Sequence, residues 1–366
     1  MESFSGIYAG RRVLVTGHTG FKGGWLCHWL LKLGAQVHGI ALAPETTPSL
    51  FQASGLETLL ASHRLIDLTA AAAIRDAIVA IRPEIVFHLA AQPLVRRSYR
   101  EPAATFATNV MGTVHVLESL RAAGSVRVGV MITSDKCYEN REWLWGYREH
   151  EAMGGHDPYS ASKGASEIVV ASWRRSFLKN EGIRVASARA GNVIGGGDWS
   201  EDRIVCDAMR CLSTGQMLPV RNPGARRPWQ HVLEPLGGYL LLGMHLLGER
   251  GDEFADGWNF GPETASIRPV ADLADRLVRA WGSGGWIDRS DPANPHEASW
   301  LALSWEKAFH RLGWHPVWGF DQTIERTVAW YRQHLVEQRS AAELIQQQLE
   351  EYVADARARG LSWAKR

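Results

Sequence analysis

The stretch Val13-Leu14-Val15-Thr16-Gly17-His18-Thr19-Gly20-Phe21-Lys22-Gly23 decides how this chain folds. Its apolar start predicts a strand, and the residues Trp25, Leu26, Trp29, Leu30 and Leu33 follow the glycines at helical spacing. Gly34 then marks the end of that helix, and Gln36–Ala41 is a second predicted strand. A glycine turn between strand and helix presents backbone N–H groups and a helix N-terminus to a pyrophosphate. The stretch therefore predicts a βαβ unit that binds a dinucleotide.

Strand and helix patterns continue to alternate as far as residue 190. Further strands are expected over 64–66, 85–89, 127–133 and 184–189, and helices over 70–81, 109–123 and 161–179. This regular alternation predicts an α/β fold with a doubly wound, parallel Rossmann-type sheet. In such a sheet, ligands bind beyond the carboxyl ends of the strands.

The character of the sequence changes near Gly191, where loops rich in Gly, Pro and Arg replace the alternation. Such loops form pockets more readily than cores. An apolar helix at 235–247 is expected to return to the sheet. We therefore expect four parts: a dinucleotide-binding domain over 1–190, its return segment over 229–258, a smaller, mostly C-terminal substrate domain over 191–228 and 259–340, and a C-terminal helix over 341–366.

Composition narrows the class of protein. The 366 residues carry a formal net charge of +1 with no basic block, which argues against nucleic acid or an anionic membrane as partner. Four cysteines, Cys27, Cys137, Cys206 and Cys211, have spacings that suit neither a zinc site nor a disulfide framework, so no metal is expected. Neither a signal-peptide core nor an apolar run of about 20 residues is visible. These observations predict a cytoplasmic protein.

A tyrosine and a lysine, Tyr159 and Lys163, lie four residues apart and therefore on one face of a helix. We expect the ammonium of Lys163 to lower the pKa of the phenol from its usual value of about 10. Such a phenol can take a proton from a hydroxyl. The pair alone occurs by chance in many helices, but downstream of the glycine turn it indicates hydride chemistry on an alcohol.

Three polar residues, Ser134, Asp135 and Lys136, follow the strand predicted over 127–133. This position lies over the nicotinamide in a doubly wound sheet. An ordinary dehydrogenase needs only the hydroxyl there, so a carboxyl group suggests that a leaving hydroxyl is protonated. The alternative is that Asp135 caps the following loop, and the residues alone leave both interpretations open.

The chain resembles the extended branch of the short-chain dehydrogenase/reductase superfamily through its glycine turn and the Tyr159–Lys163 pair. Within that branch it is similar to the CDP-glucose 4,6-dehydratases over residues 10–331. Four stretches carry the likeness: Thr16-Gly17-His18-Thr19-Gly20-Phe21-Lys22-Gly23-Gly24-Trp25-Leu26, His88-Leu89-Ala90-Ala91-Gln92, Thr133-Ser134-Asp135-Lys136-Cys137-Tyr138 and Ala190-Gly191-Asn192-Val193-Ile194-Gly195-Gly196-Gly197-Asp198-Trp199.

The resemblance implies a lyase that converts CDP-glucose to CDP-4-keto-6-deoxyglucose and water, a step of deoxysugar biosynthesis such as that for lipopolysaccharide O-antigen. NAD would take hydride from C4 and return it to C6. Tyr159 with Lys163 would remove the O4 proton, Ser134 would bind the same oxygen, and Asp135 would protonate the departing O6. Alternatives are a nucleotide-sugar 4-epimerase, another nucleoside-diphosphate-hexose 4,6-dehydratase, or a non-catalytic, dinucleotide-binding regulatory protein.

Lys136 departs from the related dehydratases that act on deoxythymidine-diphospho-glucose. Those enzymes have an Asp-Glu pair here, and their Glu is the C5 base. An amine is a poor base at neutral pH unless burial or a neighbouring cation lowers its pKa. Lys136 is therefore expected to act as the base directly or to position a water that does, and the sequence does not choose between them.

The expected cofactor is NAD, with NADP the less favoured alternative. Ala41 stands where many such folds place a ribose-binding carboxylate, while Lys22 keeps a 2′-phosphate conceivable. Asp67 is expected either to bind the adenine amine or to cap the helix that begins near Thr69. The implied cofactor-binding residues are Gly17, Thr19, Gly20, Phe21, Lys22, Gly23, Asp67, Leu68, Leu89, Ala90, Ala91, Tyr159 and Lys163.

The remaining expectations concern the sugar nucleotide and the assembly. The implied substrate-binding residues are Gln92, Arg97, Asn192, Arg203, Arg227 and His296. Arg227 is expected to grip the diphosphate, because a guanidinium pairs two phosphate oxygens at once, although the adjoining Arg226 could take that contact. Helices over 109–123 and 161–179 are expected to pair between subunits, giving a homodimer or homotetramer.

Overall fold

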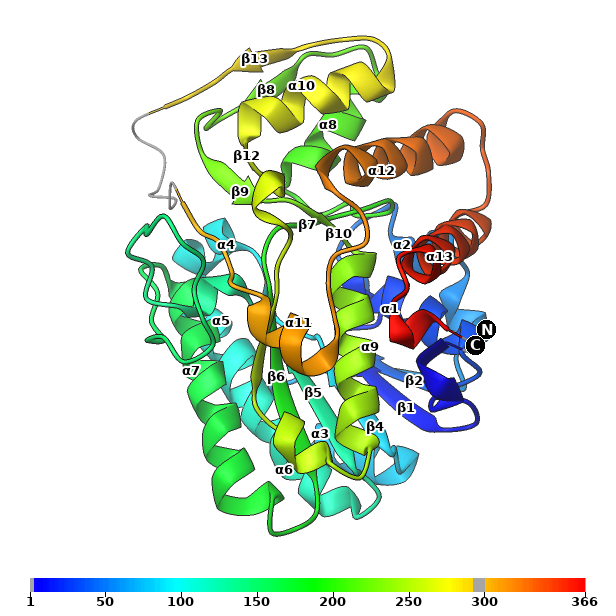
Figure 1. Ribbon diagram of the computed structural model, residues 1–366, viewed down its shortest axis with the longest axis vertical. Coiled ribbons are helices and arrows are strands. Elements are labelled where there is room, and N and C mark those ends of the chain that lie inside the picture. Colours follow the sequence, from blue (N-terminus) through cyan, green and yellow to red (C-terminus); the bar gives the residue numbers. More distant parts are fainter. Residues whose placement is uncertain (1–2, 292–299, 366) are drawn as a thin grey trace.

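A seven-stranded parallel β-sheet forms the centre of the computed structural model, which describes residues 3–291 and 300–365 (Figure 1). The strands lie in the order β11-β6-β5-β4-β1-β2-β3. Their bounds are β1 Arg12–Thr16, β2 Gln36–Ala41, β3 Ser62–Leu65, β4 Ile85–His88, β5 Val128–Ile132, β6 Arg184–Ala190 and β11 Gly257–Phe260. Because the chain winds outward from β1 in both directions, the predicted doubly wound Rossmann-type sheet is confirmed.

Helices cover both faces of the sheet. Val13 and Val15 of β1 lie in one hydrophobic cluster, and Leu14 between them lies in another on the opposite face. The first cluster includes side chains of α1 (Phe21–Lys32) and α9 (Leu233–Leu247); the second includes those of α3 (Ala71–Ile81), α6 (Gly112–Ala123) and α7 (Pro158–Trp173). Burial on both faces explains why these strands are continuous apolar runs in the sequence.

Several predicted elements have different bounds in the structure, and the C-terminal helix expected over 341–366 ends at Ala358. Two further cases show the cause. The helix expected over 109–123 becomes α-helical at Gly112, because a π-helical turn, Ala107–Met111, joins it to α5, Pro102–Phe106. The strand expected over 64–66 is β3, Ser62–Leu65. In both cases the apolar pattern locates the element, whereas backbone hydrogen bonding sets its ends.

The segments after β6 build a second group of elements, which lies at the top of Figure 1. Its helices are α8 Ile204–Ser213, α10 Val270–Trp281 and α12 Phe320–Leu335. Its short strand pairs are β7 Val193–Ile194 with β10 Gln230–His231, β9 Arg226–Pro228 with β12 Ile267–Pro269, and β8 Leu218–Val220 with β13 Trp286–Asp288.

Three shorter helices lie elsewhere in the chain: α2 Leu50–Ala53, α4 Val95–Arg100 and α11 Glu306–Leu312.

The C-terminal segment packs against helices that flank the main sheet as well as against the upper group of elements. Helix α13, Ala341–Ala358, contributes Leu344, Ile345 and Leu349 to the same cluster as α1 and α9. Lys32 at the end of α1 donates to Glu350 of α13 at 2.7 Å. Trp363 stacks on Phe4, with ring centroids 4.9 Å apart, so the two ends of the described chain lie side by side (Figure 1).

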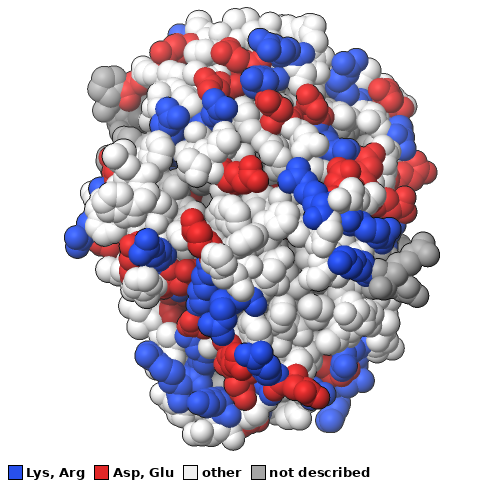
Figure 2. All heavy atoms as spheres, viewed as in Figure 1, with Lys and Arg blue, Asp and Glu red and all other residues white. Residues whose placement is uncertain are grey.

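Charge is mixed across the surface. Figure 2 shows Lys and Arg interspersed with Asp and Glu on the face that it displays, and neither sign forms a continuous field there. Over residues 3–291 and 300–365, the helices include none that combines the length and apolar character needed to span a membrane.

Candidate active site

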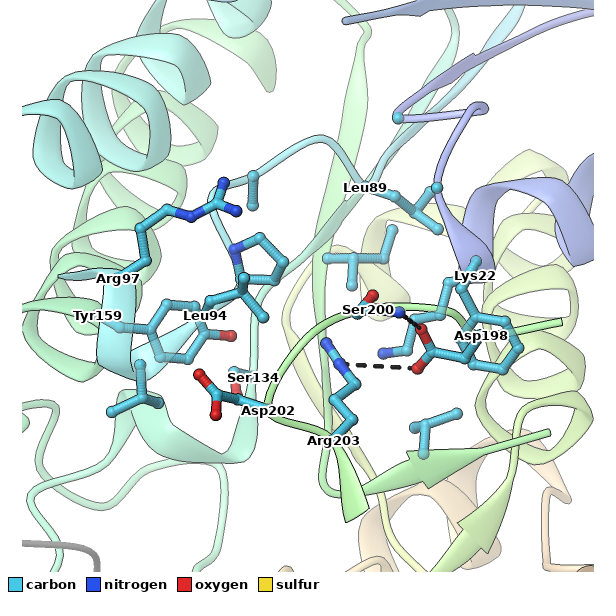
Figure 3. Close-up of a pocket in the computed structure, with 18 of the residues that line it drawn as sticks. Lys22, Leu89, Leu94, Arg97, Ser134, Tyr159, Asp198, Ser200, Asp202 and Arg203 are labelled. Atoms are coloured by element: carbon cyan, nitrogen blue, oxygen red, sulfur yellow. Dashed lines mark hydrogen bonds and ion pairs between the residues drawn. The ribbon is translucent and has the colours of Figure 1, made fainter. Parts of the chain in front are cut away.

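A cavity of about 1060 Å³ opens where β1, β4, β5 and β6 end. In Figure 3, Tyr159 and Arg97 lie on one side of this cavity, Lys22 and Asp198 lie on the other, and Arg203 lies between them. The lining brings together these residues that the sequence singled out: Gly17, Thr19, Gly20, Phe21, Lys22, Gly23, Asp67, Leu68, Leu89, Ala90, Ala91, Arg97, Ser134, Asp135, Lys136, Tyr159, Lys163, Asn192, Arg203 and Arg227.

The glycine turn leaves the backbone no room for side chains. Gly17 has φ +78°, and a Cβ there would lie 2.8 Å from the backbone nitrogen of Ala90. A Cβ at Gly23 would lie only 2.0 Å from the carbonyl oxygen of Gly17. Helix α1 can therefore begin directly against the turn, with its N-terminal N–H groups at the cavity wall. This arrangement fits a pyrophosphate.

Tyr159 and Ser134 meet inside the cavity. Tyr159 is 7 % exposed, and its hydroxyl shares a hydrogen bond with Ser134. Its backbone N–H donates to Ser98 Oγ at 3.1 Å, which fixes the first turn of α7. Burial raises the pKa of Tyr159 to about 12, and the hydrogen bond with Ser134 only partly offsets that rise.

The expectation that Lys163 lowers the pKa of Tyr159 is therefore wrong for the protein's own side chains. The Lys163 ammonium points instead at the end of β5, where Nζ donates to the Ile132 carbonyl at 3.5 Å. Burial also lowers the pKa of Lys163 to about 8. The two side chains share a helix face, as the spacing predicted, but burial of the phenol raises its pKa above the usual value.

Asp135 is a buried carboxyl group with one oxygen available. Ser134 Oγ donates to Asp135 Oδ1 at 3.0 Å, whereas Oδ2 is buried and has no hydrogen-bond partner among the described residues. Burial raises the pKa of Asp135, although Lys136 and the Ser134 hydrogen bond oppose that rise. A raised pKa favours the protonated acid.

The alternative in which Asp135 caps the following loop is not what the structure shows. The cap of the short 3₁₀-helix Asp135–Cys137 is Ser134, whose Oγ accepts from the backbone N–H of Lys136 at 3.2 Å. Gly191 makes room for the carboxyl group, because a Cβ there would lie 3.0 Å from Asp135 Oδ2. Lys136 is partly buried and also lines the cavity.

The part of the cavity beyond β2 and β3 begins at Ala41, the position where many such folds place a ribose-binding carboxylate. Ala41 and Leu42 line it, and Thr19 Oγ1 donates to the Leu42 carbonyl at 2.9 Å. Asp67 also lines it, with Oδ1 accepting from the backbone N–H of Thr69 at 2.8 Å. The alternative helix-capping role of Asp67 is wrong, because α3 begins at Ala71 and its N-cap is Ala70.

A second hollow of about 560 Å³ adjoins the main cavity and shares Asn192, Arg203 and Arg227 with it. Apolar side chains of α8 and β8, among them Ile204 and Val220, line its far end. Arg203 forms an ion pair with the buried Asp198 at 3.6 Å. The two hollows connect at the residues that they share.

Arg97 joins two loops across the cavity. Its guanidinium pairs with Glu45, in the loop after β2, at 2.9 Å, and with Glu201, in the loop after β7, at 3.3 Å. We call this group the Arg97 clasp. The sequence expectation gave Arg97 a substrate contact and missed both carboxylates, because neither lies near it in the chain.

Two predicted substrate residues are not part of the described lining. The Gln92 side chain is hydrogen-bonded within the fold, donating to Leu94 O at 3.1 Å and to Thr105 Oγ1 at 2.9 Å. It therefore holds the loop after β4 rather than facing the cavity. His296 lies outside the described residues. Among residues 3–291 and 300–365, no group of three or more His, Cys, Asp or Glu side chains could hold a metal ion.

Sequence reasoning also missed a buried pair behind the cavity, Glu167 and Arg189, which bond at 2.7 Å. A signal for it exists in the sequence. Glu167 lies four residues after Lys163, so it shares the helix face that carries the proposed chemistry. Its partner on β6 could be found only from the fold.

Curated relatives of this chain include sugar-nucleotide dehydratases. The CDP-glucose 4,6-dehydratase of Salmonella typhimurium (strain LT2) is 50 % identical over 332 residues, which cover 89 % of this chain and 92 % of that protein. The dTDP-glucose 4,6-dehydratase of Streptomyces antibioticus is 30 % identical over 328 residues, 87 % of this chain and 92 % of that protein.

Solved structures with the same fold include a dehydratase and an epimerase. The dTDP-glucose 4,6-dehydratase of Streptomyces venezuelae, solved with NAD bound, has a TM-score of 0.75, 23 % identity and coverage of 88 % of this chain and 97 % of that one. The UDP-glucose 4-epimerase of Thermotoga maritima, solved with UDP-glucose, also has a TM-score of 0.75, with 22 % identity and coverage of 88 % and 99 %. The fold alone does not separate these activities.

The model of one family matches residues 13–248, the part of the chain that holds the glycine turn, the Ser134–Lys136 segment and the Tyr159–Lys163 pair. The cavity geometry agrees with that match, since the turn fits a pyrophosphate. This chain is an enzyme of the NAD dependent epimerase/dehydratase family, and NAD is its cofactor.

Proposed function

We propose that this protein is a hydro-lyase that converts CDP-glucose to CDP-4-keto-6-deoxyglucose and water. The observation that carries the proposal is the buried Asp135 beside Ser134 and Tyr159, because an acid at that point serves a leaving hydroxyl. The 50 % identity to a CDP-glucose 4,6-dehydratase supports the choice of substrate.

The first step removes the O4 proton of the sugar. The chemistry that NAD supplies when bound is the acceptance of hydride from C4 and its later return to C6. Tyr159 is the base, and Ser134, already hydrogen-bonded to its hydroxyl, orients O4 beside it. Since burial raises the pKa of Tyr159 to about 12, the cationic charge of Lys163 is needed to hold the phenolate during this step.

The second step eliminates water across C5 and C6. The 4-ketone acidifies the C5 proton, which Lys136 removes directly or through a water that it positions. Asp135 gives its proton to the departing O6. Its raised pKa supports this role, because an acid must hold its proton until the hydroxyl leaves.

We propose that the second hollow binds the nucleotide portion of the substrate. Arg227 is 7 % exposed on β9, and its charge acts on Asp135, so it lies between the two hollows. A guanidinium there suits a diphosphate. Arg203 and Asn192 share the boundary. On this proposal, residues 191–228 and 259–340 serve as the substrate domain, and 1–190 with 229–258 as the cofactor domain.

The test is turnover by the purified enzyme. Incubation with CDP-glucose and NAD should give a 4-keto product with its characteristic absorbance in alkali, and UDP-glucose should give much less. A 4-epimerase would yield CDP-galactose and no such absorbance. Tyr159→Phe should lose about 100-fold or more in rate while NAD binding persists, since only the phenolic oxygen is removed. Full activity in that variant would refute the assignment.

We further propose that two subunits pair through α6 and α7. The exposed apolar side chains of this region support it: Phe106, Met111, Ile168 and Phe177 are 39 %, 48 %, 62 % and 39 % exposed. Sedimentation equilibrium should give a dimer or tetramer. Ile168→Glu should shift it toward monomer, while Val336→Glu, at an apolar site with the same 62 % exposure after α12, should not. A monomeric wild-type protein would contradict the pairing.

A cytoplasmic location is part of the same proposal. The four cysteines are free thiols, and three of them, Cys27, Cys137 and Cys206, are buried. Burial raises the pKa of each of these three thiols, so they behave as small apolar side chains. Free, protonated thiols are typical of proteins in a reducing compartment.

A further inference from the structure

A buried ion pair lies behind the helix that carries Tyr159 and Lys163, outside the lining of both hollows. Glu167 on α7 and Arg189 on β6 have side chains only 4 % and 5 % exposed. Arg189 Nη2 donates to Glu167 Oε2 at 2.7 Å, and Nε donates to Oε1 at 2.9 Å. Burying two charges is costly even when they pair, so such a pair is weak support for stability alone.

The carboxylate of Glu167 connects α7 to the end of β5 and to the middle of β6. Thr133 Oγ1 donates to Glu167 Oε1, and Ser187 Oγ of β6 donates to Oε2 at 2.6 Å. Thr133 is the residue before Ser134. The carboxylate thus fixes the helix of Lys163 against the strand end that carries the other reacting groups.

The guanidinium of Arg189 extends the connection to the segment after Asp135. Its Nη1 donates to Tyr138 Oη at 2.5 Å and to the Glu149 carbonyl at 3.0 Å. Tyr138 Oη donates in turn to Asn259 Oδ1 of β11 at 2.8 Å. Since Tyr138 lies two residues after Lys136, this network holds the segment of the proposed acid and base from its far end.

The charge of Glu167 also acts on Lys163, one helical turn earlier. Burial lowers the pKa of Lys163 to about 8, and Glu167 opposes that fall. The titratable groups around Lys163 are Tyr159 and Glu167 of α7, Cys137 of the 3₁₀-helix, His88 of β4 and Lys22 of α1. Among these described groups, Glu167 alone is a carboxylate.

We propose that Glu167 and Arg189 are the positioning pair of this active site. They fix Lys163 relative to the Asp135–Lys136 segment, and the Glu167 carboxylate supplies the negative charge that keeps Lys163 an ammonium ion. Neither residue touches substrate or cofactor. The inference rests on the proposed function for the roles of Lys163, Asp135 and Lys136, but its electrostatic part can be measured without turnover.

The test uses Glu167→Gln, which removes the charge and nearly keeps the shape. Lys163 is followed by NMR in the full-length enzyme with carbon-13-labelled lysine, and its signal is assigned with Lys163→Arg. Without the carboxylate the ammonium should be lost at lower pH, by about one pH unit. The alkaline limb of the kcat profile should move down by the same amount, and Glu167→Asp should restore most of the shift.

A matched control is Glu234→Gln. Glu234 is also a fully buried carboxyl group, held by the backbone N–H groups of Val317 and Trp318 on the other side of the sheet, and burial raises its pKa to about 7. It should lower stability without moving the Lys163 titration. An unchanged Lys163 midpoint in Glu167→Gln would overturn the inference. If wild-type enzyme fails to convert CDP-glucose while the midpoint shifts as stated, the proposed function fails and the electrostatic role stands.

Glu167→Gln leaves Arg189 partly unpaired, and the variant could fail to fold. Tyr138→Phe is then decisive, because it keeps Glu167 and Arg189 paired and removes the hydroxyl that links Arg189 to Asn259. It should lower kcat about tenfold or more, with NAD affinity unchanged. Tyr8→Phe is its control, since Tyr8 is a buried phenol that donates to the Leu240 carbonyl at 2.6 Å away from both hollows. Equal kcat in the two variants would overturn the positioning role.

Discussion

At the scale of the residue, burial decides the chemistry more than spacing does. Tyr159, Lys163 and Asp135 were all found from sequence, because their types and order are informative. Their protonation was not predictable in the same way: the pKa of Tyr159 rises rather than falls, since the fold removes the phenol from water. The burial of a side chain depends on segments that are distant in the sequence. A local motif therefore does not predict how buried its residues will be.

The raised pKa of Asp135 leads to a prediction for Asp135→Asn. The amide keeps the shape of the carboxyl group but cannot protonate O6, so oxidation at C4 should proceed while water loss slows about 100-fold or more. Reduced nicotinamide should therefore accumulate on the enzyme, visible as a rise in the NADH absorbance band after CDP-glucose is added. Normal product formation without that rise would remove Asp135 from the acid role.

Lys136→Met tests the proposed C5 base. Methionine keeps the length of the side chain and removes the amine, so hydride transfer from C4 should continue and elimination should stall. Mass spectrometry of the recovered sugar nucleotide and of any product formed in heavy water measures the step: wild-type enzyme should place deuterium at C5, and the variant should not. Incorporation at the wild-type rate would mean that Lys136 acts only through charge or binding.

At the scale of the element, the sequence located every strand of the central sheet except β11, which was not singled out as a strand. These strands could be located from the glycine turn, the apolar runs and the helical patterns that follow them, because each of these is a local pattern in the sequence. The start of α6 was misplaced, because a π-helical turn replaces the regular period there. The Arg97 clasp and the Glu167–Arg189 pair were missed, since each joins elements that only the folded sheet brings together.

The close approach of helix α1 to the glycine turn can be tested with one substitution. Gly23→Ala would place a Cβ 2.0 Å from the Gly17 carbonyl oxygen, so the turn must move and NAD affinity should fall about tenfold or more. Gly24→Ala is the control in the same helix, because its Cβ would meet only the flexible Leu50 side chain, at 3.1 Å. Titration of NAD by tryptophan fluorescence compares them; equal affinities would contradict the close-approach argument.

At the scale of the whole molecule, α13 belongs to the same core as the cofactor domain. The sequence predicted a C-terminal helix over 341–366 but not where it packs, since a helical pattern does not show which partner covers its buried face. The structure supplies that partner. Leu344, Ile345 and Leu349 belong to the same hydrophobic cluster as α1 and α9, on one face of the sheet. The end of the chain thus supports the helix that begins at the glycine turn.

This shared core predicts cooperative unfolding. Leu349→Ala should lower the free energy of unfolding by about 2–5 kcal/mol, because Leu349 is fully buried, while the exposed Glu343→Ala should change it by less than about 0.5 kcal/mol. Urea unfolding of both variants should remain a single transition by circular dichroism and tryptophan fluorescence. A separate early transition assigned to the C-terminal helix would show that it folds independently of the sheet.

We expect the Arg97 clasp to make the rate of ligand release depend on ionic strength. Its ion pairs with Glu45 and Glu201 are partly exposed, and such pairs contribute about 1 kcal/mol or less. Salt shortens the screening length from about 10 Å at 0.1 M to about 3 Å at 1 M, so the loops should separate more often as salt rises. Stopped-flow release of bound NAD should quicken with sodium chloride in wild-type enzyme and stay nearly constant in Arg97→Gln. Bound ligands would then be released most slowly at low ionic strength and fastest at high concentrations of sodium chloride.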